Sequence, residues 1–386
     1  MRIAILCLLC APLFTRAEVK NPLTAKEIQD GWLLLFDGNS TFGWQTTKGG
    51  WTVQNNLLTA PGKLANLTST SAFLDYEIHV EYEIAQGGSL AMVTHANDQG
   101  ESIGRIGELK FFRFPGLCRA KIKVYNGRAG SGSFGPVQGR QGAGFGGGSD
   151  GAPRRSAAHL AFRGHNCTIK SIKLKPTSLK SIFNGKNLDG WKIHPGRKSK
   201  FTVKNGVLHV KDGNGDLQTK GQWADFVLQL ECKVNGKNLN SGIFFRCIPD
   251  KYQQGYESQI HNGFDAKTKK TYTLQQYDPQ TNKPSKKIKV TSTAKDYGSG
   301  GIYRRQPARF QAAKDGEWFT MTVLAHGRHI STWVNGLQVA DWTDHRPLKD
   351  NARQGCRLKK GAISIQGHDP TTDLSFRNFR ILNHAN

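Results

Sequence analysis

The chain has 386 residues, of which 54 are Lys or Arg and 29 are Asp or Glu, so its formal net charge is +25. At about 150 residues per domain, this length predicts two domains. No run of about 18 apolar residues occurs, which excludes a transmembrane helix. The 44 glycines and the aromatic content of 10% favour short strands and turns over long helices.

The N-terminus has the pattern of a secretory signal peptide. Arg2 supplies a positive charge, residues 3–14 form an apolar run, and Ala17 is a small residue at the expected cleavage point. We therefore expect residues 1–17 to be removed and the protein to be exported, either to the periplasm or outside the cell. The alternative is a buried N-terminal strand.

The cysteines allow disulfides but do not require them. Cleavage of the signal leaves Cys118, Cys167, Cys232, Cys247 and Cys356, an odd number, so at least one thiol is free or pairs between chains. Cys232 and Cys247 flank one predicted hairpin, where they could form a bridge or remain two buried thiols. No CxxC motif occurs in the mature part, which argues against a zinc ribbon.

Two parts of the chain resemble each other in order. This internal repeat predicts a divergent first copy over residues 18–177 and a second copy over residues 178–386, meeting near Pro176–Lys180. The matching pairs are FDG…GW (36–44) with FNG…GW (183–191), WTVQN (51–55) with FTVKN (201–205), and DYEIHVE (75–81) with DFVLQLE (225–231).

The first copy carries a glycine-rich stretch over residues 127–151, with 11 glycines in 25 positions. Such a composition buries little apolar surface, so we expect a flexible surface loop without a catalytic role. It is not a phosphate-binding loop, because no GK[ST] follows it and no strand–helix context surrounds it.

Most of the remaining sequence reads as short strands separated by turn residues such as Asn335-Gly336. The best helix candidate is Leu23–Asp30, which opens with the cap-like Thr24 and Glu27. We expect an all-β protein made of two antiparallel jelly-roll sandwiches in tandem.

Positive charge is concentrated between Lys267 and Lys314. This stretch contains 12 Lys or Arg residues and only two acidic residues, Asp278 and Asp296. Either nucleic acid or an anionic surface, cell wall or polysaccharide could bind such a stretch. The export signal, and the lack of a helix-turn-helix, RRM or zinc-finger pattern, favour the anionic surface. We therefore expect no nucleic-acid partner.

Strand alternation brings candidate site residues together. In YESQIH, Glu257, Gln259 and His261 share one face, and in GIFFR, Phe244 and Arg246 share a face. A sugar ring can stack on an aromatic side chain while planar charged groups bind its hydroxyls, so this combination predicts a carbohydrate site. The alternative is a surface salt bridge between neighbouring strands.

Three further residues are weaker candidates. His368 stands at a strand end, Tyr303 follows a glycine-rich turn, and Trp333 could stack on a sugar. A surface histidine, a packing tyrosine and a core indole are the alternatives. The stretch from Asp212 to Asp216 resembles the start of a calcium loop, but it lacks the required glycine and closing glutamate and predicts a tight turn.

At these residues the sequence resembles the 3-keto-disaccharide hydrolase domain family, also described as 3-keto-glucoside 1,2-lyases and 3-keto-2-hydroxy-glucal hydratases. The resemblance covers residues 181–383, with a divergent copy over residues 33–175. It implies concanavalin A-like lectin/glucanase jelly rolls, an exported protein and a site on the concave sheet for oxidised glycosides. The motifs are SIFNGKNLDGW, GDLQT, NSGIFFR, YESQI, GGIY, GEWF, WVNG and IQGH…LSFRNFRI; the family's recurring polar positions fall on Arg246, Glu257, Gln259, Tyr303 and His368.

The chemistry that this resemblance implies needs a base, a partner for an oxyanion and an acid. A ketone at C3 acidifies the C2 hydrogen, so a base can remove it and the C1 aglycone can leave, after which water adds. Glu257 or His261 could be the base, Arg246 the oxyanion partner, and His368 or Tyr303 the acid. A divalent metal on His261, Glu257 or His368 could replace Arg246.

Two functions follow from these features. In the first, residues 178–386 are a hydrolase or lyase of 3-keto-glycosides and the first copy is an accessory module. In the second, the whole chain is a non-catalytic sandwich that binds carbohydrate or a cell surface. The polar residues favour the enzyme, with its site in the second copy only, because the equivalent segment SLAMV (89–93) has no arginine and the first copy has no YExQI.

Overall fold

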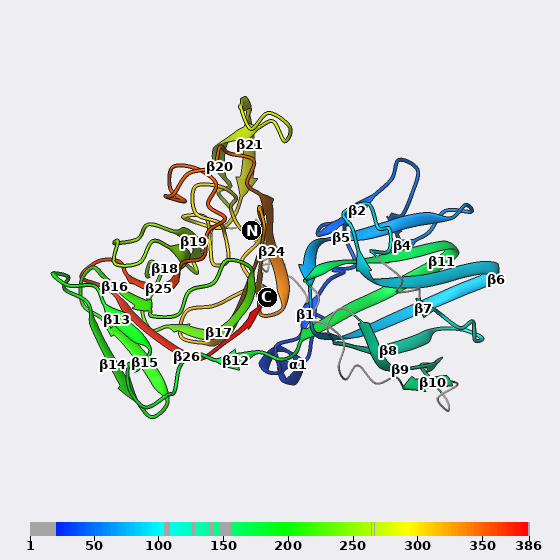
Figure 1. Cartoon of the computed structure of the whole chain (residues 1–386), viewed down its shortest axis with the longest axis horizontal. Coiled ribbons are helices and arrows are strands. Elements are labelled where there is room, and N and C mark those ends of the chain that lie inside the picture. Colours follow the sequence, from blue (N-terminus) through cyan, green and yellow to red (C-terminus); the bar gives the residue numbers. More distant parts are fainter. Residues whose placement is uncertain are drawn as a thin grey trace, which may run out of the picture.

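The computed structural model describes residues 21–103, 109–125, 128–138, 143–146, 156–263, 265 and 267–384. The signal-like segment 1–17 lies outside these residues. Strands dominate, and the sheets pack as sandwiches, which confirms the predicted all-β jelly-roll fold (Figure 1). No helix in the described ranges is long and apolar enough to cross a membrane.

The first half contains one short helix and eleven strands among the described residues. Helix α1 begins after Thr24, whose side chain and Glu27 form the expected capping box. Strands β6 and β11 are long and pair along most of their length. The elements are α1 (Ala25–Gln29), β1 (Leu33–Leu34), β2 (Trp44–Thr46), β3 (Thr52–Gln54), β4 (Leu57–Thr59), β5 (Ala65–Phe73), β6 (Tyr76–Ala96), β7 (Leu109–Lys110), β8 (Cys118–Tyr125), β9 (Arg128–Pro136), β10 (Ala143–Gly146) and β11 (Ala158–Pro176).

The glycine-rich stretch is not a loop where the structure describes it. Strand β9 pairs with β8 from Cys118↔Pro136 to Tyr125↔Arg128, and β10 pairs with β9. The Phe134 side chain is buried in the core of the first half. The prediction of a loop is therefore wrong over β9 and β10: the backbone hydrogen bonds to β8 and one aromatic anchor compensate for the few side chains. Residues 126–127, 139–142 and 147–155 lie outside the described ranges.

The second half is a sandwich of two sheets around its own core. One sheet has five strands in the order β13-β16-β25-β18-β19, and a larger antiparallel sheet containing β17, β22 and β26 faces it across a core rich in Phe, Ile, Leu and Val. The elements are β12 (Lys180–Ser181), β13 (Trp191–Ile193), β14 (Lys200–Lys204), β15 (Val207–Lys211), β16 (Gly215–Thr219), β17 (Phe226–Val234), β18 (Ser241–Cys247), β19 (Tyr256–Ile260), β20 (Lys270–Tyr277), β21 (Pro284–Ser292), β22 (Trp318–His326), β23 (His329–Val334), β24 (Leu337–Thr343), β25 (Ala362–Gly367) and β26 (Asp373–Asn383).

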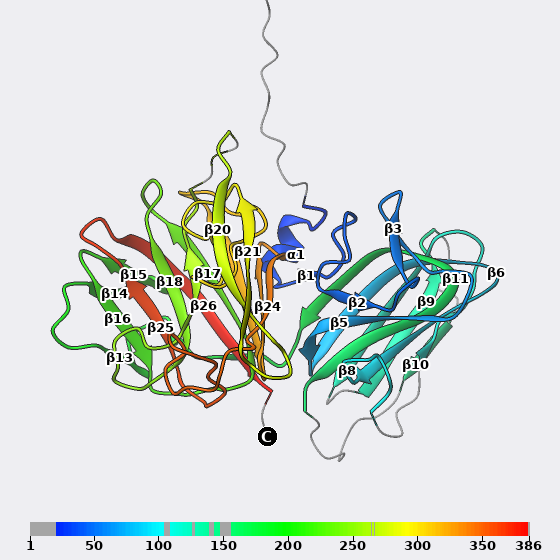
Figure 2. The same ribbon diagram turned by 90° about the horizontal axis from the view of Figure 1, so that it is seen from above.

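Strand β1 joins the two halves, which lie side by side (Figures 1 and 2). It pairs with β11 of the first half and, at Leu34↔Leu337, with β24 of the second. The predicted turn Asn335-Gly336 forms, with φ of 49° and 74°, and a Cβ on Gly336 would lie 2.6 Å from the Trp32 carbonyl oxygen. A glycine is therefore required both by the turn and by the close approach of β1. The predicted boundary near Pro176–Lys180 falls between β11 and β12, and the division into two domains stays a prediction.

All five cysteines of the described chain are free and buried. Cys232 and Cys247 belong to the two facing sheets of the second half, on β17 and β18, and burial raises the pKa of both thiols well above the ordinary value. Of the two interpretations of this pair, buried thiols and a bridge, the structure has the buried thiols.

Candidate functional site

The five-stranded sheet has one apolar face and one polar face. Ile243, Phe245, Tyr256, Ile260 and Ile365 alternate onto the side that packs into the core. The other side, which we call the polar face, carries mostly side chains with oxygen and nitrogen atoms. Its residues are Lys192, Asp216, Gln218, Gly242, Phe244, Glu257, Gln259, Ser364 and Gln366.

The strand register arranges the polar face in rows. Phe244 stands opposite both Glu257 and Ser364, and Gln259 stands opposite Gly242. Gly242 leaves room for the Glu257 side chain, because a Cβ at this position would lie 2.7 Å from Glu257 Oε1. Glu257 thus lies across a neighbouring strand that has no side chain to block it.

Glu257 is the most unusual acid of this face. Its side chain is only 6% exposed, and Oε2 accepts a hydrogen bond of 3.1 Å from a terminal guanidinium nitrogen of Arg353. Burial raises the pKa of Glu257 to about 7, although Arg353 opposes this shift; Asp296 adds to it. A carboxyl with such a pKa is partly ionised at neutral pH, as a general base must be.

The raised pKa of Glu257 predicts a pH-dependent stability. The folded protein holds this proton more tightly than the unfolded chain, whose carboxyl has the ordinary pKa of 4.5, so this group makes stability fall as the pH rises from about 4.5 to 7. Glutamine imitates the protonated acid. We expect Glu257→Gln to change the free energy of unfolding little at pH 4 and to raise it at pH 8, on the order of 3 kcal/mol. Urea unfolding at both pH values measures this difference.

Asp341 provides a control for which the pH dependence of stability should have the opposite sign. It is also largely buried, with 12% of its side chain exposed, yet its pKa lies below the ordinary 3.8 despite this burial, because His329, Ser331 and Thr70 all hydrogen-bond the carboxylate. This group adds stability above the ordinary pKa, so Asp341→Asn should cost more stability at pH 8 than near pH 2. The same pH trend in both variants would contradict the assignment for Glu257.

A cavity of about 230 Å³ lies beside Glu257. Tyr303 and Arg353 also line it, and the backbone N–H of Tyr303 donates to the Glu257 carbonyl oxygen at 3.0 Å. The Arg353 guanidinium lies 5.1 Å from the centre of the Phe244 ring and 5.8 Å from that of Tyr303. Of the predicted site residues, Glu257, Tyr303 and Phe244 therefore gather here, with Phe244 fully buried beneath the arginine.

Arg246 is not part of this cavity, contrary to the prediction. A bulge separates Phe244 from Cys247, and Arg246 has φ of 50°, so the alternation breaks at this residue. Phe244 and Cys247 consequently share a face, while the Arg246 side chain is fully buried on the other side. There its guanidinium donates to Asp225 Oδ1 at 2.9 Å and to three main-chain carbonyl oxygens. Each of its three guanidinium nitrogens is already engaged in these bonds.

The predicted acid and metal ligands do not converge. His261 Nδ1 accepts from the Gly263 N–H, and burial lowers its pKa. His368 pairs with Asp369 at 2.8 Å and is 40% exposed, four residues beyond Ser364, which places it about 13 Å along the strand from the Glu257 row. The described residues hold no group of three or more His, Cys, Asp or Glu side chains that could bind a metal. A metal shared by His261, Glu257 and His368 does not fit this arrangement.

The two remaining substrate-binding candidates differ. Gln259 lies on the polar face as predicted, and its amide donates to Asp296 Oδ2 and to the Asp296 carbonyl oxygen, both at 2.9 Å. Trp333 is 1% exposed and belongs to the core of the first half, where its ring lies 6.4 Å from that of Phe73. Its predicted role in sugar stacking is therefore wrong: the first half covers it.

Two important residues escaped the sequence analysis. Arg353 lies in the loop between β24 and β25, where no pattern marks it. Asp216 is fully buried on the polar face, where burial raises its pKa to about 6, and its Oδ1 has no hydrogen-bond partner among the described residues. Applying strand alternation to GDLQT, as to YESQI, would have placed Asp216 on the same face as Gln218 instead of in a tight turn.

Comparison with known proteins gives one family. The model of the 3-keto-alpha-glucoside-1,2-lyase-like domain matches residues 31–105 and 178–382, which include β1 to β6, β12 to β25 and all but the last residue of β26. No protein among the curated ones compared matches the chain.

Several solved structures are similar over about half of the chain. Two proteins of Parabacteroides distasonis ATCC 8503 assigned as glycosyl hydrolases match with 19% and 25% identity; they cover 53% and 54% of this chain and 93% and 100% of their own, each with a TM-score of 0.39. A carbohydrate-binding module, CBM66, from Bacillus subtilis matches with 12% identity, 49% and 93% coverage and a TM-score of 0.30. At these scores none of them bears on the chemistry of this chain.

Proposed function

Because the chain belongs to the 3-keto-alpha-glucoside-1,2-lyase-like family, we propose that its second half cleaves 3-keto-glucosides by removing the proton at C2. The observation that carries this proposal is Glu257, a buried carboxyl on the wall of a cavity with a pKa raised to about 7. A base with a pKa near the working pH combines a useful ionised fraction with a strong pull on the proton.

The neighbours of Glu257 supply the other two roles. Arg353 lies within 3.1 Å of the carboxylate and is 31% exposed, so its guanidinium can reach a substrate oxygen beside the base. We assign it to the oxyanion that develops on the C3 oxygen, the role that the family resemblance predicted for Arg246. We assign Tyr303, which lines the same cavity, to the protonation of the departing aglycone oxygen.

The proposed reaction balances without a redox partner. Glu257 takes the C2 proton, and the electrons of that bond move toward the C3 ketone, whose oxygen Arg353 stabilises. The C1–oxygen bond then breaks, the aglycone leaves with a proton, and a C1–C2 double bond remains. Water adds its hydroxyl to C1 and a proton returns to C2, which yields the aglycone and 3-keto-glucose.

Deuterium distinguishes this route from direct hydrolysis. We expect purified protein, incubated with 3-keto-trehalose in D2O, to release glucose and a 3-keto-glucose that carries deuterium at C2, as NMR would show. Direct hydrolysis at C1 keeps the C2 hydrogen. Incubation of 3-keto-glucose alone with the protein corrects for exchange after release, and cleavage without C2 deuterium would contradict the proposal.

A further inference from the structure

Arg305 is a partly buried cation at the junction of several cavities in the second half. It lines the cavity of about 230 Å³ that contains Glu257, a smaller one of about 40 Å³, and a larger one of about 550 Å³. Arg304 lines the first two of these, and His345 lines the last two. A single arginine thus borders the whole set of spaces next to the proposed base.

No acid neutralises Arg305 within the part of the chain that the structure describes. Its guanidinium donates only to main-chain oxygens, at 3.0 Å to Arg353 and at 3.4 Å to Arg304. Asp344 acts on it electrostatically, but both oxygens of that carboxylate accept from the Arg346 guanidinium, at 2.8 and 2.7 Å. The Tyr256 hydroxyl also donates to Asp344, at 2.7 Å.

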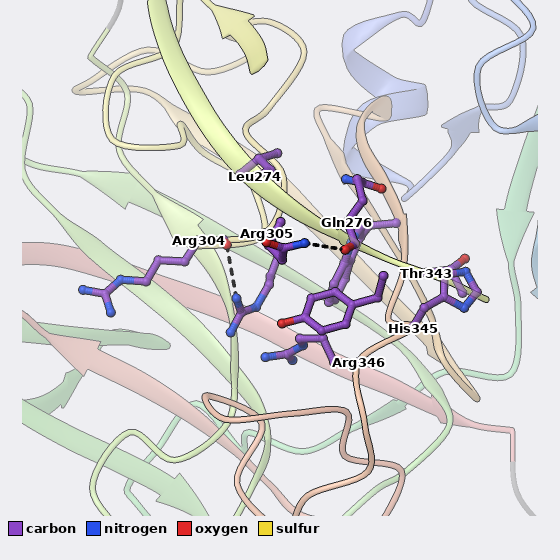
Figure 3. A pocket seen from close by; sticks show the side chains of 10 residues that line it. Leu274, Gln276, Arg304, Arg305, Thr343, His345 and Arg346 are labelled. Carbon is purple, nitrogen blue, oxygen red and sulfur yellow. Dashed lines mark hydrogen bonds between the residues drawn. The ribbon is translucent and has the colours of Figure 1, made fainter. Parts of the chain in front are cut away.

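The surroundings of Arg305 destabilise its charged form. Burial, followed by the repulsion of Arg346, lowers the pKa of Arg305 to about 10. Figure 3 shows the Arg305 and Arg346 side chains next to each other, while Arg304 extends away from them. Charged side chains are rarely taken out of water without a partner, so a partly buried guanidinium that hydrogen-bonds no carboxylate among the described residues, and that borders open space, indicates a site that an anion completes.

We infer that Arg305 forms a subsite for an oxyanion group, a carboxylate or a sulfate, on the substrate. The planar guanidinium matches such groups with two parallel hydrogen bonds. This inference rests on the proposed function for its substrate: it assigns to the enzyme a 3-keto-glucoside with an acidic group on the aglycone or on a neighbouring sugar.

The hairpin of β20 and β21 extends this positive surface. It projects from the second half, pairs with no other sheet, and contributes Leu274 and Gln276 to the cavities around Arg305 (Figures 1 and 3). Its exposed lysines form no ion pair with any described residue. Such a surface raises the rate at which an anion arrives, an effect that weakens with salt. The lysines are Lys270, Lys283, Lys286, Lys287 and Lys289.

Binding of small anions tests the subsite directly, without turnover. We would titrate the full chain with sodium glucuronate and, separately, with sodium sulfate, at constant ionic strength maintained with NaCl, and follow the unfolding midpoint and the heat of binding. Glucose is the neutral control. At least one of the two anions should raise the midpoint where glucose and NaCl do not, because a ligand that binds only the folded state stabilises it. A response to neither anion overturns the inference.

Single substitutions test whether this anion binding depends on Arg305. Arg305→Gln should weaken anion binding about tenfold or more, the usual effect of losing charge-assisted hydrogen bonds. Arg305→Lys keeps the charge but not the fork of donors, and should weaken binding less; it serves as the test if the glutamine variant does not fold. Lys186→Gln removes the same charge from an exposed residue that lines none of these cavities and lies outside the hairpin, and it is the matched control. Unchanged binding in a folded Arg305 variant overturns the inference.

Kinetics separate this inference from the proposed function. Phenyl and 4-carboxyphenyl 3-keto-glucosides differ in one carboxylate, and the ratio of their kcat/KM values should favour the acid and fall about tenfold in Arg305→Gln. Anion binding without any cleavage would overturn the proposed function and keep the subsite. Cleavage of both substrates with equal efficiency would overturn the subsite and keep the function.

Discussion

Replacing Glu257 with glutamine is expected to lower kcat/KM on a 3-keto-glucoside by about 10²-fold or more, the usual effect of removing a general base. The change is nearly isosteric; it removes the negative charge that pairs with Arg353 and, with it, the ability to accept the C2 proton. In the unaltered protein, kcat/KM should rise with pH and level off above about 7, because the base works in its ionised form and burial raises its pKa to about 7. That rise should disappear in the variant.

The matched control is another buried, ion-paired glutamate of the same half. Glu231 is 8% exposed, and its carboxylate pairs with Arg377, which stands opposite it on the neighbouring strand β26 of the larger sheet, away from the cavity. Glu231→Gln is therefore expected to leave kcat/KM within about twofold once both variants are shown to be folded. Activity that survives Glu257→Gln, or that both variants lose equally, would place the base elsewhere.

Removing Arg246 is expected to damage the fold. Arg246→Met should lower the free energy of unfolding by about 3–5 kcal/mol, because it takes one partner from a buried ion pair and leaves the acceptors unpaired. These acceptors are Asp225 Oδ1 and the main-chain oxygens of Ala224, Gly327 and Arg357. Urea unfolding, with the slope checked for two-state behaviour, measures the loss.

Arg353→Met is the contrasting variant. Its side chain is partly exposed, but it pairs with Glu257, donates to the Gln253 carbonyl oxygen and lies over the Phe244 ring, so about 1–2 kcal/mol of stability should be lost, less than in Arg246→Met. Turnover should fall about 10²-fold or more, because the guanidinium beside the base is gone. If Arg246→Met were folded and inactive while Arg353→Met kept its activity, the roles assigned to the two arginines would be reversed.

The local sequence was sufficient to predict those features that depend on neighbouring residues alone. Asn335-Gly336 predicted a tight turn because both residues adopt positive φ easily, and the turn formed. The alternation of YESQIH correctly put Glu257 and Gln259 on the face opposite the core. The family resemblance was also readable, because it rests on short motifs whose order along the chain is preserved.

Strand alternation predicted the wrong face for Arg246, because a bulge at this residue interrupts the alternation. A bulge shifts the side-chain period by one, so every later residue of the strand changes face. Nothing in GIFFR marks that position: the positive φ of Arg246 is held by hydrogen bonds to Asp225, Gly327 and Arg357, which come from three other parts of the chain. The error is therefore one of long-range structure.

The sequence by itself determined the all-β class, the turns, and the face on which the acid Glu257 lies, since these depend on neighbours within a few residues. The tertiary structure alone decided which cation accompanies that acid. Arg353 is 96 positions from Glu257, and only the packing of a patternless loop brings the two within 3.1 Å. It also decided that Trp333 is core, because the first half covers it, and that the glycine-rich β9 is a strand, because β8 offers it backbone partners. Contacts between distant segments depend on how whole sheets pack, and no short window of sequence contains that information.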